Sequence, residues 1–291
     1  MADTLILNFN PALDRTAVVE RYNPYGVNKA KRLVVLPGGK GANLGRALKT
    51  LGYSNFVCSG ILGGVIGNIV KRLLDREGIP NDYFWIEDET RIAYATYEES
   101  SGMGTITNEK GPVVTEEELE RCIRFIKDRY LASVRRVILS GGAPPSIIPE
   151  KIKELLNIFK VADKEIFIDT SGEILKVCAG LGPFCIKINE DELKDAFGIS
   201  IEDRKSLREF YTNLSKLGTN WLIITRGEKG AILLSRDRLI IGKNKKIYSH
   251  YAIGSGDAFL GGVIYGRISG LDIVEILRLG MACGAANTLE F

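Results

Sequence analysis

Near the carboxyl end of the chain, a turn of small residues runs straight into an apolar segment with helical spacing: Gly254-Ser255-Gly256-Asp257-Ala258-Phe259-Leu260-Gly261-Gly262. A glycine-rich turn that opens a helix leaves the first backbone N–H groups of that helix unpaired. These donors, together with the helix dipole, attract an anion. The sequence therefore predicts an anion site at residues 254–257, with Asp257 in the first helical turn beside it.

An anion pocket that touches a carboxylate suits phosphoryl transfer. The amides stabilise charge on the moving phosphoryl group, and the carboxylate of Asp257 accepts a proton from the attacking hydroxyl, which contributes about 10²–10⁴-fold in rate. The alternative is that Asp257 only caps its helix. The spacing alone divides these two interpretations evenly.

A second glycine-rich stretch precedes another predicted helix: Pro37-Gly38-Gly39-Lys40-Gly41-Ala42-Asn43. Adjacent glycines let a ligand approach the backbone, Lys40 offers a point charge to an anionic group, and the amide of Asn43 can bind hydroxyls as donor and acceptor. The plainer interpretation is a glycine turn with a solvated lysine. The stretch is neither a Walker A loop nor the fingerprint of a Rossmann oxidoreductase, and neither sequence occurs elsewhere in the chain.

Predicted strands and helices alternate along the chain, and the strand segments are apolar runs without polar alternation. This pattern is typical of an α/β fold with a mostly parallel sheet covered by helices on both faces. Ligands of such sheets bind at the carboxyl ends of the strands. The predicted strands span residues 4–8, 55–59, 136–140, 165–169, 184–188 and 221–225; the predicted helices span residues 42–51, 65–77, 149–160 and 204–217, and one more begins at a capping box of Thr115 and Glu118.

Two segments break this alternation, residues 16–36 and 85–111. Both contain strand-like pieces, and neither supports a good helix. We expect them to form a small antiparallel sheet, a lid inserted in two pieces into an α/β body of residues 1–15, 37–84 and 112–291. The alternative is a pair of ordinary surface hairpins.

Bulk composition limits the function classes. Of 291 residues, 45% are hydrophobic and 26% charged, as in ordinary globular proteins. The net charge of +3 is too small to indicate nucleic acid. Five cysteines without a Cys-x-x-Cys pair, and a single histidine (His250), predict reduced thiols and no zinc site. With no signal-peptide features and no apolar run of membrane length, we expect a cytoplasmic protein without a membrane partner.

The ordered set of three motifs resembles the ribokinase-like (PfkB) family of sugar kinases. The motifs are Asn10-Pro11-Ala12-Leu13-Asp14, then residues 38–43, then residues 254–257, and the resemblance covers nearly the whole chain. It implies a ribokinase-like central sheet with a small β-sheet lid, and ATP and Mg²⁺ as cofactors. It also implies that Asp257 is the catalytic base, with the amides of Gly254, Ser255, Gly256 and Asp257 forming the anion hole.

The resemblance further implies a nucleotide side of the site. The family motif Asn-x-x-Glu matches Asn189-Glu190-Asp191-Glu192 and would organise magnesium through water molecules, whereas the residues alone favour a helix-start carboxylate for Glu192. Lys187 resembles the family lysine near the nucleotide phosphates. The residues implied for the nucleotide itself are Lys187, Asn189, Thr225, Gly227, Gly230 and Asn287.

On the acceptor side, the chain resembles the phosphosugar branch: fructose-1-phosphate kinases, tagatose-6-phosphate kinases and minor 6-phosphofructokinases. Asp14 would bind sugar hydroxyls, and Lys40 and Arg91 would bind the phosphate that the substrate already carries. The remaining implied acceptor residues are Gly38, Gly39, Asn43 and Ser140. Lids of this family often pair across a homodimer.

Some residues depart from the family pattern and keep alternatives open. The Ser-Gly-Ser stretch of the branch reads Ser140-Gly141-Gly142 here, and Ala252 replaces a hydroxyl residue before the late glycines. Relatives usually continue through a further loop and helix after the position of Phe291, so we expect either a trimmed chain or an incomplete wall of the nucleotide pocket. The alternatives are a kinase of an unphosphorylated sugar or nucleoside, and a non-catalytic protein that binds sugar phosphates or nucleotides.

Overall fold

The computed structural model describes residues 2–244 and 253–289. His250 and Ala252, both singled out from the sequence, lie outside the described residues. Within the part of the chain that is described, no helix is long and apolar enough to cross a membrane.

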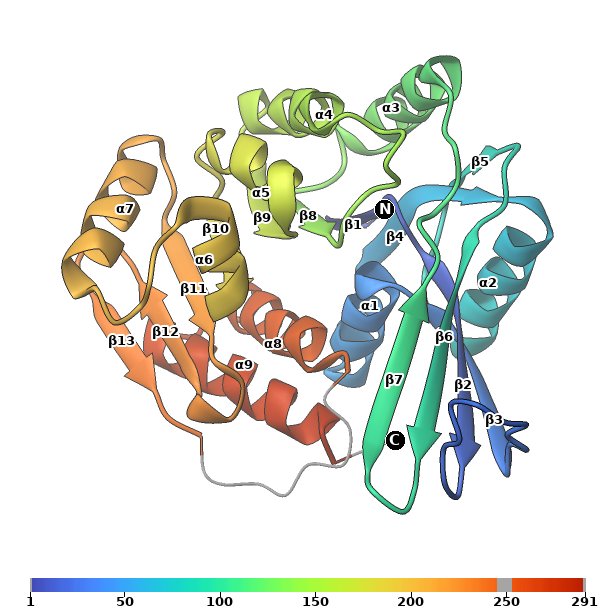
Figure 1. The fold of residues 1–291 in the computed structure, drawn as a ribbon. Coiled ribbons are helices and arrows are strands. Elements are labelled where there is room, and N and C mark those ends of the chain that lie inside the picture. Colours follow the sequence, from blue (N-terminus) through green and yellow to red (C-terminus); the bar gives the residue numbers. More distant parts are fainter. Residues whose placement is uncertain (1, 245–252, 290–291) are drawn as a thin grey trace.

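The described residues form a nine-stranded sheet in the order β13-β12-β11-β10-β9-β8-β1-β4-β5 (Figure 1). The strands from β11 to β5 run parallel, and β12 and β13 continue the sheet antiparallel at one edge. Strands β1 and β4 are buried along their whole length, which accounts for the absence of polar alternation in their sequences. The predicted α/β fold is confirmed. The strands are β1 (Thr4–Asn8), β4 (Phe56–Gly63), β5 (Phe84–Ile86), β8 (Arg136–Ser140), β9 (Glu165–Asp169), β10 (Cys185–Asn189), β11 (Trp221–Thr225), β12 (Ala231–Leu234) and β13 (Leu239–Gly242).

Helices cover both faces of this sheet and enclose two hydrophobic cores. One core lies between the sheet and α1, α2, α8 and α9, and the other between the sheet and α3 to α7. The predicted capping box of Thr115 and Glu118 is present at the start of α3. The helices are α1 (Lys40–Thr50), α2 (Gly64–Glu77), α3 (Glu116–Tyr130), α4 (Pro149–Val161), α5 (Gly172–Ala179), α6 (Glu190–Phe197), α7 (Arg204–Lys216), α8 (Ser255–Ile268) and α9 (Ile273–Asn287), with a short 3₁₀ turn at Gly227–Lys229.

A small sheet stands beside the body in the order β3-β2-β6-β7 (Figure 1). Its strands are β2 (Ala12–Val19), β3 (Arg32–Gly38), β6 (Arg91–Glu98) and β7 (Met103–Asn108). The expectation of an antiparallel sheet is wrong for the central pair, because β2 and β6 run parallel, from Ala12 beside Arg91 to Val19 beside Glu98. The reason is topological. Strand β2 follows β1, and β6 follows β5, and β1 and β5 run in the same direction in the large sheet. The chain therefore enters the small sheet in the same direction both times.

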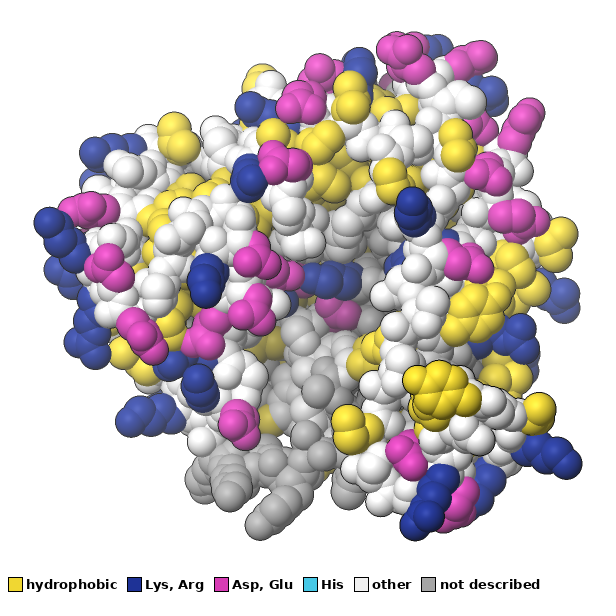
Figure 2. Space-filling model, in the orientation of Figure 1, with side chains coloured by type: hydrophobic (Ala, Val, Ile, Leu, Met, Phe, Trp, Pro, Cys, Tyr) yellow, Lys and Arg dark blue, Asp and Glu magenta, His cyan; other side chains and the backbone are white. Residues whose placement is uncertain are grey.

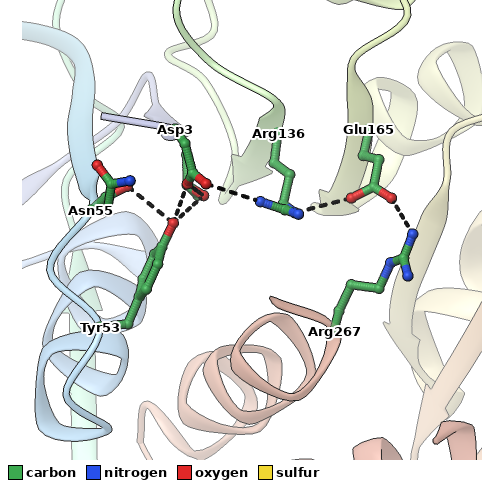
Figure 3. Close-up of polar contacts among 7 residues, drawn as sticks. Asp3, Tyr53, Asn55, Arg136, Glu165 and Arg267 are labelled. Carbon is green, nitrogen blue, oxygen red and sulfur yellow. Dashed lines mark hydrogen bonds and ion pairs between the residues drawn. The ribbon is translucent and has the colours of Figure 1, made fainter. Parts of the chain in front are cut away.

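Charged side chains tie several elements together at the amino ends of the strands (Figure 3). Arg136 Nε lies 3.0 Å from Glu165, and Arg136 Nη1 lies 3.4 Å from Asp3. Arg267, near the end of α8, contacts the other oxygen of Glu165 at 2.5 Å and stacks over the ring of Phe184 at 4.9 Å. This network anchors α8 at the end that is opposite to its glycine turn.

Candidate active site

The glycine turn before α8 has the geometry of an anion site. Gly254 adopts φ +81°, a left-handed conformation that favours glycine. Among the described residues, no side chain caps this helix end. The amide of Asp257, which was expected to join the anion hole, instead donates to the backbone carbonyl of Gly254 at 3.0 Å, so the anion site is left to the amides before it. A Cβ on Gly256 would lie 3.0 Å from the amine of Lys187, so glycine lets the lysine come close. The helix end and the amine therefore face the same space.

Asp257 does not use its carboxylate to cap its own helix. Its Oδ2 accepts a 2.9 Å hydrogen bond from Nδ2 of Asn43 on α1, and the residue is only 5% exposed. Burial, and next the negative charge of Asp169, raise the pKa of Asp257 to about 6, against the opposing effects of the Asn43 hydrogen bond and of Lys187 and Lys40. A carboxylate with this pKa is ionised at neutral pH and still has an appreciable affinity for a proton, which suits a general base.

A buried aspartate joins the two lysines of the site. Lys40 Nζ and Lys187 Nζ each lie 3.1 Å from Oδ1 of Asp169, which is fully buried. Burial favours the neutral acid, but the charges of Lys187 and Lys40 hold the pKa of Asp169 below its ordinary value. Burial also opposes the charged form of Lys40, yet Asp169, Glu192 and Asp257 together raise its pKa. The site therefore carries alternating charges at neutral pH.

The small sheet contributes a third aspartate to the site. Asp14 lies on β2, and a Cβ on Gly38 would lie 2.1 Å from its Oδ1, so only glycine leaves room for this side chain. Burial raises the pKa of Asp14 to about 6, although the charges of Arg91 and Arg46 lower it. Arg91 Nε donates to the backbone carbonyl of Asn10 at 3.2 Å, which orients its guanidinium.

Asn189 and Glu192 form a reciprocal capping box at the start of α6. The amide of Glu192 donates to Asn189 Oδ1 at 2.7 Å, and the amide of Asn189 donates to Glu192 Oε2 at 2.9 Å. The helix-start role predicted from the residues alone is thus present, while Glu192 Oε1 lies 3.8 Å from Lys40. No group of three or more His, Cys, Asp or Glu side chains within residues 2–244 and 253–289 is arranged to hold a metal ion.

All these elements border one cavity of about 670 Å³, which is lined by residues of both the body and the small sheet. Figure 2 shows the hollow between the two, with basic and acidic side chains at its inner end. Most of the residues predicted from the sequence line this cavity: Asp14, Gly39, Lys40, Asn43, Arg91, Lys187, Asn189, Glu192, Thr225, Gly227, Gly230, Gly254, Ser255, Gly256 and Asp257.

Three predicted residues are not part of the lining. Gly38 lies behind Asp14. Ser140 is fully buried at the end of β8, and its hydroxyl has no hydrogen-bond partner among the described residues. Asn287 Nδ2 donates to the carbonyl of Ile253 at 2.9 Å and lies 3.4 Å from the hydroxyl of Ser255, so it braces the glycine turn.

Sequence reasoning missed two charged residues of the site, Asp169 and Arg46. Asp169 is the last residue of β9, and polar residues at the carboxyl ends of parallel strands are the expected signal, so it was detectable. Arg46 lies within α1 and donates from Nη1 to Asn43 Oδ1 at 2.9 Å. Nothing in its local sequence distinguishes it from an ordinary helical arginine.

Nearly the whole chain resembles known proteins. Residues 8–291 match the model of the pfkB family of carbohydrate kinases. The chain is 31% identical over 291 residues to a 1-phosphofructokinase of Borreliella burgdorferi, covering 98% of this chain and 91% of the relative. It is 26% identical over 293 residues to a tagatose-6-phosphate kinase of Staphylococcus epidermidis, covering 98% and 92%.

Solved structures agree with this comparison. Phosphofructokinase-2 from Escherichia coli superposes with a TM-score of 0.91 at 23% identity, over 99% of this chain and 94% of that chain, which shows the shared fold. A possible 1-phosphofructokinase from Thermotoga maritima has a TM-score of 0.86 at 26% identity, over 99% and 92%. Since the family match spans nearly every residue of the cavity and of both sheets, the chain belongs to the pfkB family of carbohydrate kinases.

Proposed function

We propose that this enzyme transfers the terminal phosphoryl group of ATP to a hydroxyl of a ketohexose phosphate, namely fructose-1-phosphate, tagatose-6-phosphate or fructose-6-phosphate. The observation that carries the proposal is the buried carboxylate of Asp257 beside the uncapped amino end of α8, in a cavity that also holds Lys40 and Lys187. The relatives named 1-phosphofructokinase and tagatose-6-phosphate kinase support the acceptor class.

In this proposal, Asp257 takes the proton of the attacking hydroxyl. Because Asn43 occupies Oδ2, the proton goes to Oδ1. The amides of Gly254, Ser255 and Gly256 stabilise the charge that develops on the transferred group, whereas the amide of Asp257 already donates to the carbonyl of Gly254 at 3.0 Å. Lys187 neutralises phosphate oxygens beside these amides. Asp257 and Lys187 are 5% and 4% exposed, which limits the access of water to the catalytic carboxylate.

The acceptor would be held from the small sheet. Asp14 accepts hydrogen bonds from sugar hydroxyls, and Arg91 grips the phosphate of the acceptor with its fork of N–H donors. The amine of Lys40 is already paired with Asp169 at 3.1 Å. It would therefore divide its charge between Asp169 and the acceptor phosphate. Arg91 therefore carries most of the discrimination in favour of a phosphorylated acceptor.

The oxygen donors of the site suit a hydrated Mg²⁺ that binds together with ATP. Asn189 and Glu192 offer amide and carboxylate oxygens, and the buried Oδ2 of Asp169 has no hydrogen-bond partner among the described residues. Mg²⁺ keeps several of its waters, so it does not need a cage of three protein ligands. When bound, the ion neutralises charge on the ATP phosphates; Thr225, Gly227 and Gly230 would line the nucleotide beside it.

The test is a coupled ADP-release assay with Mg-ATP and five acceptors: fructose-1-phosphate, tagatose-6-phosphate, fructose-6-phosphate, fructose and ribose. We expect turnover on phosphorylated ketoses only, and the acceptor with the highest kcat/KM is then the substrate. A protein that binds ATP and turns over none of the five contradicts the proposal and favours a binding protein.

One observation favours a second candidate, a kinase of an unphosphorylated sugar. Ser140 lies outside the cavity, and Lys40 is engaged by Asp169, so two of the residues expected near the acceptor phosphate are directed elsewhere. In the same assay, turnover confined to fructose or ribose would select this candidate. It would also remove the phosphate role from Arg91.

We further propose that the small sheet of β2, β3, β6 and β7 acts as a lid on the α/β body, and that two chains pair through their lids. The bounds expected from the sequence, 16–36 and 85–111, are shifted: β2 begins at Ala12, β3 ends at Gly38, and residues 85–86 belong to β5 of the large sheet. The face of the small sheet that carries Asp14 also carries Leu36 and Ile106, which are 42% and 46% exposed. Burial against a second chain would remove this apolar surface from water. Light scattering after size exclusion should give a dimer, and Leu36→Lys with Ile106→Lys should give a monomer; a wild-type monomer would contradict pairing.

A further inference from the structure

The side-chain amide of Asn43 stands between the carboxylate of Asp257 and the guanidinium of Arg46. Its Nδ2 donates to Asp257 Oδ2 at 2.9 Å, and its Oδ1 accepts from Arg46 Nη1 at 2.9 Å. Turning the amide by 180° would place oxygen against carboxylate and NH₂ against guanidinium. Only one orientation satisfies both neighbours, and Arg46 is the residue that selects it.

Arg46 is itself held in place from two sides. Its Nε lies 2.8 Å from Glu77 Oε2 and its Nη2 lies 3.1 Å from Glu77 Oε1, the fork-to-fork arrangement that fixes a guanidinium plane. Nη2 also donates to the backbone carbonyl of Pro37 at 3.1 Å. Since Asn43 and Arg46 are three residues apart on α1, they share one helix face. A continuous hydrogen-bonded chain thus runs from the end of α2, through α1, to Asp257 on α8.

We propose that Arg46 and Glu77 are positioning residues for the catalytic base: Glu77 fixes the guanidinium of Arg46, which fixes the amide of Asn43 as a donor to Asp257. This inference rests on the proposed role of Asp257. It adds a role to Asn43, which was expected to bind sugar hydroxyls: its oxygen accepts from Arg46 and keeps a second lone pair for a hydroxyl.

Two consequences follow for the base. The hydrogen bond from Asn43 to Oδ2 restrains the rotation of the Asp257 carboxylate and leaves Oδ1 for the acceptor hydroxyl. The donated hydrogen bond also keeps the pKa of Asp257 lower than burial alone would set it. Arg46 lowers the pKa of Asp14 as well, so one guanidinium acts on both carboxylates that border the acceptor.

The central variant is Arg46→Met, which removes the donor and keeps the aliphatic stem. Without the guanidinium, the Asn43 amide can turn either way, so the carboxylate of Asp257 loses a fixed donor. We expect kcat to fall by about 10- to 100-fold, the usual cost of a misplaced reacting group. KM for ATP should stay within about twofold, and the acid limb of the kcat–pH profile should move to higher pH, because the pKa of Asp257 rises.

Matched variants separate positioning from simple bracing. Arg46→Lys retains the charge but not the forked donors, and its kcat should lie between those of Arg46→Met and the wild type. Glu77→Gln preserves the shape of the side chain and should lower kcat less than Arg46→Met does, because the carbonyl of Pro37 still holds the guanidinium. Arg136→Met is the control: it removes a guanidinium held between two carboxylates at the amino ends of the strands, opposite to the site (Figure 3). That control should lower Tm and leave the acid limb of the kcat–pH profile unchanged.

A readout without turnover keeps the two proposals distinguishable. The side-chain carboxyl carbon of Asp257, assigned by comparison with Asp257→Asn, can be titrated by ¹³C NMR in the wild type and in Arg46→Met. A higher pKa in Arg46→Met supports the inference. An unchanged titration and pH limb, with only a lower Tm, would overturn it and make Arg46 a clamp between α1 and α2. Absence of wild-type turnover on every acceptor refutes the proposed function instead, and the titration still decides this inference.

Discussion

Replacing Asp257 by Asn should remove most turnover and, at the same time, make the protein more stable at neutral pH. The substitution preserves the shape of a side chain that is only 5% exposed, so the cavity and the Asn43 contact region stay filled. What changes is the ability to accept a proton and the presence of a buried negative charge. Loss of the proton acceptor lowers kcat, whereas loss of the buried charge raises the unfolding free energy.

The magnitudes follow from the raised pKa. Loss of a general base costs about 10²–10⁴-fold in kcat. Burial raises the pKa of Asp257 from 3.8 to about 6, and each pKa unit corresponds to about 1.4 kcal/mol. The folded protein therefore binds this proton more tightly than the unfolded chain does. The resulting destabilisation is absent below pH 4, grows as the pH rises from about 4 to 6, and reaches about 3 kcal/mol at pH 7.

The assays are the coupled ADP-release measurement and urea denaturation at pH 5 and pH 7. We expect Asp257→Asn to retain nucleotide binding, to lose turnover, and to gain more unfolding free energy at pH 7 than at pH 5. Near-wild-type turnover would refute the role of Asp257 as the base. A variant that is less stable than wild type at both pH values would refute the argument that a buried, ionised carboxylate strains the fold.

Three further predictions concern the same charges. In wild type, kcat should fall about tenfold for each pH unit below 6, as Asp257 becomes protonated; a flat profile between pH 5 and pH 7 would contradict that pKa. Lys40→Ala and Arg91→Ala should each raise KM for the phosphorylated acceptor more than KM for ATP, with the larger effect from Arg91; equal effects on both substrates would place neither residue at the acceptor phosphate. Asp169→Asn leaves Lys187, which is 4% exposed, without its buried counter-charge and should lower the unfolding free energy by about 3–5 kcal/mol, seen as a fall in Tm; an unchanged Tm would show that the lysines find other partners.

The predictability of the fold depended on the length and periodicity of each element. The buried strands of the large sheet were readable because they lack polar alternation. Helix α5 was not predicted, and of α6 only the start at Glu192 was, since eight residues make barely two turns of a 3.6-residue period. The parallel pairing of β2 with β6 was also missed, because alternation along a strand shows which face is buried but not the direction of its neighbour.

The predictability of the site depended on backbone chemistry. Glycines that must adopt positive φ or make room for a carboxylate, such as Gly254 and Gly38, are visible in the sequence. The contacts of Arg46 are not, because they join α1 to the end of α2, thirty-one residues further on, through side chains of ordinary type. Ser140 is indicated by its place in a motif, yet at the end of β8 it is fully buried and does not line the cavity.

The register of the small sheet sets a fixed span across the acceptor site. Ala12 on β2 lies opposite Arg91 on β6, so Asp14 is offset from Arg91 by one strand and two residues, about 4.8 Å across and 6.6 Å along. Backbone hydrogen bonds between β2 and β6 hold that interval constant. In the proposed function, this spacing would select acceptors by the distance between their bound hydroxyl and their phosphate. Presentation of the acceptor to Asp257 would depend instead on where the small sheet stands against the body, so different parts of the fold would set the two requirements.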